Sequence, residues 1–117
     1  MAFSIKIREI NRITIVDCSG RLVFGDESLC LREHAKELLK SNKILVLNLA
    51  GVTYIDSGGL GVLVGLLTSA RAAGGDLKLA SPNARAREVL TITHLSEVFD
   101  IHPSAETAAE SVSHAAA

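Results

Sequence analysis

The spacing of apolar and polar residues predicts that the chain begins with two strands. Phe3, Ile5 and Ile7 alternate with polar residues, which is the period of a half-buried strand, and residues 13–18 predict a second one. Residues 11–12, an Asn-Arg pair, leave room for a short hairpin turn, although this turn has no glycine. An antiparallel start to a sheet is therefore expected.

A loop and a helix are predicted next. Gly20 and Gly25 bracket the loop, and Asp26 is the expected N-cap of a helix that ends near Ser41. The apolar residues of this helix recur at the spacing that a single buried face requires. They are Leu31, Ala35, Leu38 and Leu39.

The next run, ILVLNL at residues 44–49, contains a single polar residue. Such a run is typical of a strand that is buried on both faces beneath helices, so it is the best candidate for the centre of the sheet. A helix is expected over residues 60–73, and a Gly-Gly pair ends it. Gly61 and Gly65 lie on one face of this helix, which predicts a close approach of its backbone to the sheet.

The last third of the chain predicts a strand, a helix, a short strand and a final helix. Residues 76–80 alternate as a strand, and residues 81–83 introduce a helix that runs to about Thr91. Residues 99–101 suggest the short strand. The final helix starts at Ser104 and has small or apolar residues on one face, namely Ala105, Ala108, Ala109 and Val112.

This order of elements predicts an α/β fold. We expect one domain over residues 1–113, built on an open mixed β-sheet of about four to five strands packed with about four helices. Residues 114–117 are expected to form a frayed tail. Ligands and modifications concentrate in loops at the carboxyl ends of central strands in such sheets, and residues 56–59 form such a loop.

Composition narrows the possible partners. The chain has 117 residues, of which 48% are hydrophobic and only 3% aromatic, so its core must be aliphatic. Its net charge is −1 and it has no basic run, which argues against nucleic acid or an anionic membrane as a partner. Residues 1–8 alternate in polarity and show no export signal, so a cytoplasmic location is expected.

Neither cysteines nor histidines suggest a metal site. Cys18 and Cys30 lack the paired spacing of a zinc site and are expected to be buried thiols. The histidines are scattered without a pair one helical turn apart, so we expect no metal and no cofactor. They are His34, His94, His102 and His114.

Residues 55–60, IDSGGL, place an acid and a hydroxyl between two apolar runs, and the first two interpretations are chemical. The DSGG quartet also surrounds the nucleophile of chymotrypsin-like proteases. However, Ile55 and Leu60 replace the flanking glycine and proline, and the chain is too short for two barrels. A phosphate-binding loop is disfavoured as well, because neither the G-x-x-x-x-G-K-[ST] nor the G-x-G-x-x-G pattern is present.

The other two interpretations are a capped turn and a regulatory site. Asp56 or Ser57 could simply cap the following helix, with the glycines forming a tight turn. Alternatively, Ser57 is a phosphoacceptor at the helix start, where glycines leave its hydroxyl accessible to a kinase. A phosphoserine adds about −1.5 to −2 charge at pH 7, which a helix N-terminus accepts without unfolding. Phosphorylation would then change a surface while leaving the fold intact.

Four segments resemble the STAS domain, and specifically the bacterial anti-sigma factor antagonists. The segment around Asp56 and Ser57 is the most specific of them. The matching segments are VLNLAGVTYIDSGGLGVLVG at 46–65, GGDLKL at 74–79, GRLVFGDES at 20–28 and LTITHLSEVFDI at 90–101.

The resemblance implies a STAS-like fold and a partner-switching cycle. In that family the unmodified antagonist binds an anti-sigma factor that is also a serine kinase of the GHKL type, which frees the sigma factor. The kinase then phosphorylates the serine after the motif aspartate, here Ser57, and the modified antagonist dissociates until a PP2C-type phosphatase resets it. The resemblance therefore implies a kinase substrate that is not an enzyme.

The resemblance also implies a set of partner-binding residues and two departures from the family pattern. Gly58 stands where relatives often carry a second serine or another small residue, and is expected to loosen the turn. Val23 stands where many relatives have an acid, which this chain delays to Asp26. The expected partner-binding residues are Asp56, Ser57, Gly58, Gly59, Leu60, Gly61, Arg21 and Asp26.

Two other functions remain open. One is a STAS interaction or scaffold module in a different partner-switching or stressosome-like complex. The other is an enzyme or a ligand-binding domain, which turnover or a tightly bound small molecule would reveal.

Overall fold

The computed structural model of the chain describes the backbone of residues 3–116 and the side chains of residues 3–112. The predicted boundary at residue 113 and the predicted frayed tail at 114–117 involve side chains outside the described residues, and they stay predictions. The elements are β1 (Ser4–Ile10), β2 (Ile13–Leu22), α1 (Asp26–Leu39), β3 (Ile44–Ile55), α2 (Ser57–Ala72), β4 (Asp76–Ala80), α3 (Ala84–Ile92), the short 3-10 helix η1 (Leu95–Glu97), β5 (Asp100–His102) and α4 (Ala105–Ala116).

The strands form one mixed sheet in the order β1-β2-β3-β4-β5. β1 pairs antiparallel with β2, and every other neighbouring pair is parallel. The hairpin between β1 and β2 turns through Asn11 and Arg12, which both have a positive φ, as two-residue hairpin turns require. The α/β class, the antiparallel start and the central position of β3 are therefore confirmed.

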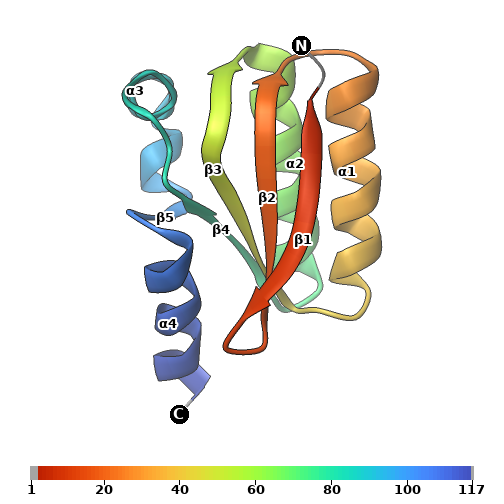
Figure 1. Ribbon diagram of the computed structural model, residues 1–117, viewed down its shortest axis with the longest axis vertical. Helices are drawn as coiled ribbons and strands as arrows, with labels where there is room; N and C mark the ends of the chain where they lie inside the picture. Colours follow the sequence, from red (N-terminus) through yellow and green to blue (C-terminus); the bar gives the residue numbers. More distant parts are fainter. Residues whose placement is uncertain (1–2, 117) are drawn as a thin grey trace.

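Helices cover both faces of the sheet. In Figure 1, α1 lies to the right of the strands, α2 lies behind them, and α4 lies at the lower left, below β5. Leu45, Leu47 and Leu49 of β3 belong to the larger core cluster, which contains the buried residues of α1 and α2. Val46, on the opposite face of the strand, belongs to a smaller cluster with the buried alanines of α4. The aliphatic run of β3 is thus buried on both faces, as predicted.

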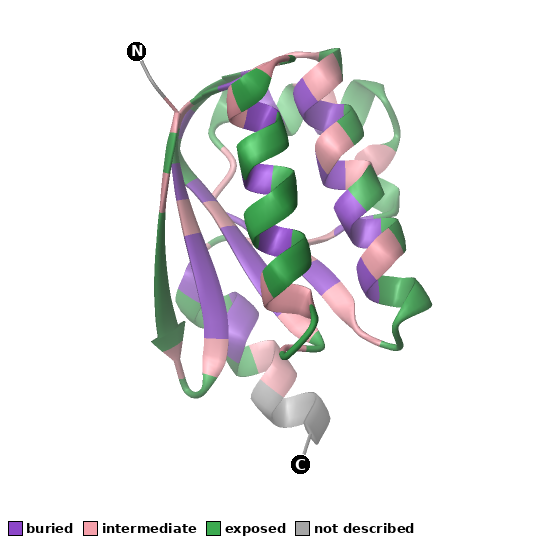
Figure 2. Cartoon of the chain, turned by 90° about the vertical axis from the view of Figure 1, so that its right-hand side faces the viewer, coloured by how far each residue is buried: buried purple, intermediate pink, exposed green. Residues whose placement is uncertain are grey.

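The outer face of α1 and the edge strand β1 are exposed to solvent. Figure 2 shows α1 and α2 side by side over the sheet, with exposed residues on the outer face of α1 and along most of the edge strand β1. Within the described part of the chain, no helix is long and apolar enough to cross a bilayer.

β2 is longer than the sequence predicts. It continues past Gly20 to Leu22, so the connection to α1 is only residues 23–25. Its pairing with β3 shifts register between Asp17 and Ser19 and again between Gly20 and Arg21. The register shifts allow Gly20 to lie inside the strand. Pairing with the long β3 thus outweighs the preference of glycine for turns.

The N-cap of α1 was predicted wrongly. Gly25, with φ 134°, precedes the helix, and Asp26 is the first helical residue. Only glycine adopts such a φ readily, and Asp26 instead lies in the first turn, where a negative charge complements the helix dipole. The prediction for the thiols was half right, because Cys18 is buried in the core but Cys30 is exposed on α1.

α2 begins three residues earlier than predicted, at Ser57. The close approach that Gly61 and Gly65 would permit does not occur, since both are exposed and a Cβ at either position would meet nothing within 4 Å. The close approach occurs instead at the first two glycines of the helix.

Candidate functional site

Ser57 is the first residue of α2 and follows the carboxyl end of the central strand β3. The side chain of Ser57 is exposed. Figure 1 shows the strand ends of β2 and β3 side by side at this end of the molecule, with the start of α2 directly behind them. The predicted position of this segment, at the carboxyl end of a central strand, is confirmed.

Asp56 fixes the start of α2 and the end of β2 together. Its Oδ1 accepts a hydrogen bond from the Gly59 amide at 2.9 Å, which makes Asp56 the N-cap of the helix. The same carboxylate accepts the Phe24 amide at 3.0 and 3.1 Å, and the Asp56 amide donates to the Leu22 carbonyl at 3.2 Å. One acid therefore ties the connection between β2 and α1 to the helix that carries Ser57.

The hydrogen bonds keep Asp56 ionised. The amides of Gly59 and then Phe24 lower the pKa of the Asp56 carboxyl, desolvation opposes them, and the Gly58 amide and the charge of Arg21 lower the pKa further. Because the pKa is lowered by folding, the stabilisation is present above the ordinary pKa of about 3.9. It is lost only as the pH falls through the lowered value of the folded protein, so the cap is intact at neutral pH.

Gly58 and Gly59 are required by the close approach of neighbouring backbone. A Cβ at Gly59 would lie 2.2 Å from the carbonyl oxygen of Leu22, and one at Gly58 would lie 2.5 Å from the Cβ and 2.8 Å from the Cα of Phe24. Gly58 thus makes room for Phe24 inside the first helical turn.

Gly58→Ser is expected to displace the segment around Phe24, because the new Cβ would stand where the Phe24 Cβ and Cα lie. Since the obstructing atoms include backbone, we expect a loss of about 1–3 kcal/mol in the free energy of unfolding. Chemical denaturation followed by circular dichroism measures this loss, and amide NMR shifts of residues 22–26 report the displacement. Unchanged stability and unchanged shifts would show that Phe24 does not depend on Gly58.

An open groove with a volume of about 280 Å³ lies between the N-terminal parts of α1 and α2, and Gly58, the residue after Ser57, is part of its lining. Phe24, at its rim, is 83% exposed, and Leu29 is 51% exposed. Sequence reasoning missed these residues, although an aromatic side chain in a chain with so few aromatics was a usable signal. The lining residues are Phe24, Gly25, Ser28, Leu29, Arg32, Gly58, Gly61 and Val62.

The other predicted partner-binding residues differ in exposure and in how they relate to Ser57. Arg21 is exposed, and its charge acts on the Asp56 carboxyl. Asp26 is exposed at the start of α1, and no hydrogen bond or ion pair among the described residues joins it to Ser57. Leu60 is only 9% exposed and belongs to the core, so it supports the site from below.

Metal-ligand clusters are not part of this arrangement. Within the described residues, no group of three or more His, Cys, Asp or Glu side chains could hold a metal ion. The site offers an exposed hydroxyl, a fixed acid, an exposed aromatic ring and a shallow groove. These are features that suit recognition by another protein.

Curated relatives match more than half of this chain. A Thermotoga neapolitana protein described as an anti-sigma factor antagonist is 44% identical over 71 residues, which is 61% of this chain and 62% of that protein. The anti-sigma-B factor antagonist of Bacillus subtilis is 37% identical over 76 residues, or 65% of this chain and 70% of its own. The matched region thus spans less than two thirds of the Thermotoga relative.

Solved structures and a family match extend the likeness to nearly the whole chain. A Thermotoga maritima protein described as an anti-sigma factor antagonist superposes with a TM-score of 0.84 at 27% identity, covering 92% of this chain and 93% of its own. The antagonist SpoIIAA in its unphosphorylated form shares the fold, with a TM-score of 0.77 at 18% identity over 95% of this chain and 97% of its own. Residues 4–108 match the STAS domain, and the chain belongs to the STAS domain family.

Proposed function

We propose that this protein is an anti-sigma factor antagonist controlled by phosphorylation of Ser57. In its unmodified form it binds an anti-sigma factor serine kinase of the GHKL type, which frees the sigma factor; phosphorylation ends that binding. One observation carries the proposal: the Ser57 hydroxyl is exposed on the first residue of a helix whose start is fixed by Asp56. Relatives named as antagonists of anti-sigma factors support it.

The kinase would transfer the γ-phosphoryl group of ATP to the Ser57 Oγ, which gives up its proton, and ADP leaves. The helix N-terminus stabilises the added charge of about −1.5 to −2, so α2 remains folded. The phosphate would stand beside the Asp56 carboxylate on the surface that meets the partner. A closely fitting partner then loses its contact through both bulk and charge.

The groove beside Ser57 gives the unmodified protein a surface to offer the kinase. Phe24 and Leu29 supply apolar area, while the exposed Gly61, with nothing within 4 Å of where a Cβ would stand, lets a partner approach the helix backbone. Arg21 and Asp26 add charges of both signs at the edge of this surface. Exposed aromatic side chains next to a shallow groove are frequent energetic centres of protein interfaces.

A PP2C-type phosphatase would close the cycle by hydrolysing the phosphoserine. The antagonist itself would catalyse neither step and would act through binding alone. Because ATP, the kinase and the sigma factor occupy the same compartment, we propose that the protein works in the cytoplasm.

Mass spectrometry tests the proposed cycle. The protein is incubated with ATP and, in turn, with each anti-sigma factor kinase of its host, and intact and peptide masses are recorded. One phosphate on Ser57, together with release from the kinase, is the expected result, and ADP in place of ATP is the control. A phosphate on another residue, or no binding to any kinase, would refute the proposal.

Phe24→Ala is expected to weaken binding to the kinase by more than about tenfold, because an aromatic side chain at the centre of an interface contributes heavily to affinity. Folding should be unaffected, since the ring is exposed and the Phe24 backbone amide still reaches Asp56. Isothermal titration calorimetry measures the change. Ile92→Ala is the matched control, because Ile92 is 68% exposed but lies at the end of α3. Equal losses in the two variants would contradict the proposed surface.

A further inference from the structure

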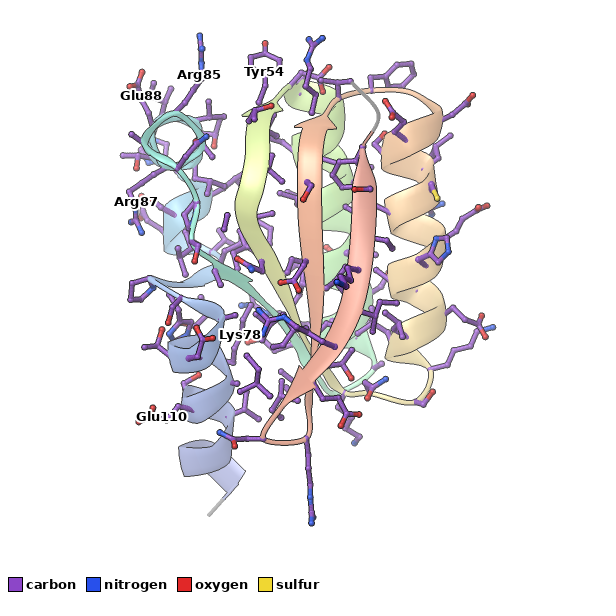
Figure 3. All side chains as sticks on the ribbon, viewed as in Figure 1. Tyr54, Lys78, Arg85, Arg87, Glu88 and Glu110 are labelled. Atoms are coloured by element: carbon purple, nitrogen blue, oxygen red, sulfur yellow. The ribbon has the colours of Figure 1, made fainter. Side chains whose placement is uncertain are left out.

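Two arginines share one tyrosine ring near Ser57. The guanidinium carbons of Arg21 and Arg85 lie 5.5 and 5.6 Å from the centroid of the Tyr54 ring. Arg21 on β2 is the register partner of Tyr54 on β3, and Arg85 comes from the first turn of α3. Figure 3 shows Tyr54 and Arg85 projecting from the end of the molecule where β3 ends. We call these three residues the arginine stack.

The arginine stack leaves its hydrogen-bond donors unused. All three side chains are exposed, and the ion pairs formed within the described residues involve neither Arg21 nor Arg85. Attraction between a guanidinium and an aromatic face holds the planar group over the ring, while the N–H groups at its edge stay available. The side chains are thus ordered before any partner arrives, which lowers the entropic cost of binding.

The arginine stack adjoins the candidate phosphorylation site. Tyr54 precedes Asp56 by two residues, at the end of the same strand. The charge of Arg21 contributes to the lowered pKa of the Asp56 carboxyl, so this guanidinium lies within electrostatic reach of the helix cap. A partner that covers Ser57 therefore comes close to Arg21.

We propose that the arginine stack binds carboxylates of an acidic segment in the partner kinase, beside the place where Ser57 is presented. The inference rests on the proposed function above and names the chemistry of the partner. The planar edge of a guanidinium matches a carboxylate, and two such edges select a segment with at least two acids. The carboxylates of Asp56 and Glu88, the latter one helical turn after Arg85, would repel any further negative charge around the two guanidiniums. A segment with two spaced acids among neutral residues therefore fits better than a nucleic acid, which carries a charge at every nucleotide.

This arrangement would also couple binding to phosphorylation. A phosphate on Ser57 would bring about −1.5 to −2 charge near Arg21 and compete with the carboxylates of the partner for that guanidinium. The same charge would repel the rest of the acidic segment. Release would then follow from a change in local charge without any change of fold.

A binding experiment that needs no kinase tests the chemistry of the arginine stack. A short peptide with two glutamates among otherwise neutral residues is titrated into the protein, and NMR follows the Tyr54 ring and the arginine side-chain N–H signals. We expect shifts at Tyr54, Arg21 and Arg85 that vanish in Arg85→Gln and persist in Arg87→Gln, whose arginine is exposed on the same helix. Absence of shifts would overturn the proposal, and shifts with oligothymidylate alone would reassign the arginine stack to nucleic acid.

A second experiment measures the contribution to kinase binding. Arg85→Gln is expected to raise the dissociation constant about tenfold, because one charge-assisted contact is lost. For the same reason, the dissociation constant should depend less on salt concentration. Arg87→Gln should bind like the wild type, and Tyr54→Phe, which keeps the ring, should bind more tightly than Tyr54→Leu. If the wild type binds and Arg85→Gln binds equally well, the inference fails while the proposed function stands. If no kinase binds the wild type, the proposed function fails, and the peptide titration still decides the chemistry of the arginine stack.

Discussion

Ser57→Ala is expected to remain bound to the anti-sigma factor kinase after ATP is added, whereas the wild type dissociates. The variant lacks the hydroxyl that would accept the phosphate, and it keeps the helix cap because the cap is the carboxylate of Asp56. Alanine is also well suited to the first turn of a helix, so folding should be unchanged. Size-exclusion chromatography of the mixture before and after ATP addition measures the bound fraction.

The control and the opposite variant sharpen this test. Ser41→Ala removes an exposed serine from the turn after α1 and should behave like the wild type. Ser57→Asp should bind the kinase with intermediate affinity, because one carboxylate carries less charge and fewer acceptor oxygens than a phosphate. Release of Ser57→Ala by ATP at the rate of the wild type would assign the acceptor to another residue.

Gly59→Ala is expected to cause the largest loss of stability. The new Cβ would meet the carbonyl oxygen of Leu22 at 2.2 Å, and this oxygen belongs to the last residue of β2, whose side chain is fully buried. Either the helix or the strand must shift, at a cost of about 3 kcal/mol or more. That is a large share of the roughly 5–15 kcal/mol that stabilises a domain, so the unfolding midpoint in urea should fall sharply.

Gly65→Ala is the matched control for Gly59→Ala. It makes the same chemical change in the same helix, but Gly65 is exposed and its Cβ would meet nothing within 4 Å. Alanine should therefore stabilise the protein by about 0.5–1 kcal/mol. Opposite shifts of the two unfolding midpoints would confirm the close approach at Gly59. A destabilised Gly65→Ala with an unchanged Gly59→Ala would contradict it.

The periodicity of the sequence predicted the order of strands and helices because most elements bury one regular face and the central strand buries both. The aliphatic run at the start of β3 marked the centre of the sheet, and the alanines of α4 marked its packing face. Element ends were less predictable where glycine was involved. Gly20 lies inside β2, and Gly59 lies inside α2, since strand pairing in one case and the Asp56 cap in the other outweigh the local preference of glycine.

The sequence indicated where a candidate site would lie, but not which contacts build it. Sequence reasoning selected Asp56 and Ser57 from their position between apolar runs. It gave no sign that the Asp56 carboxylate reaches the Phe24 amide, 32 residues away in the chain, or that Arg21 and Arg85 meet over Tyr54. Contacts between distant segments leave no local periodic pattern, so only the folded arrangement reveals them.

The hydrogen bonds from the Phe24 amide to Asp56 have an evolutionary consequence. Because Asp56 holds this segment through a backbone amide, the position of the segment does not depend on which side chain residue 24 carries. If the proposed function holds, gene duplicates could exchange that exposed side chain for another and acquire a different binding partner while keeping the same scaffold. Parallel signalling pathways in one cell could thus be insulated from one another by changes at a few solvent-facing positions.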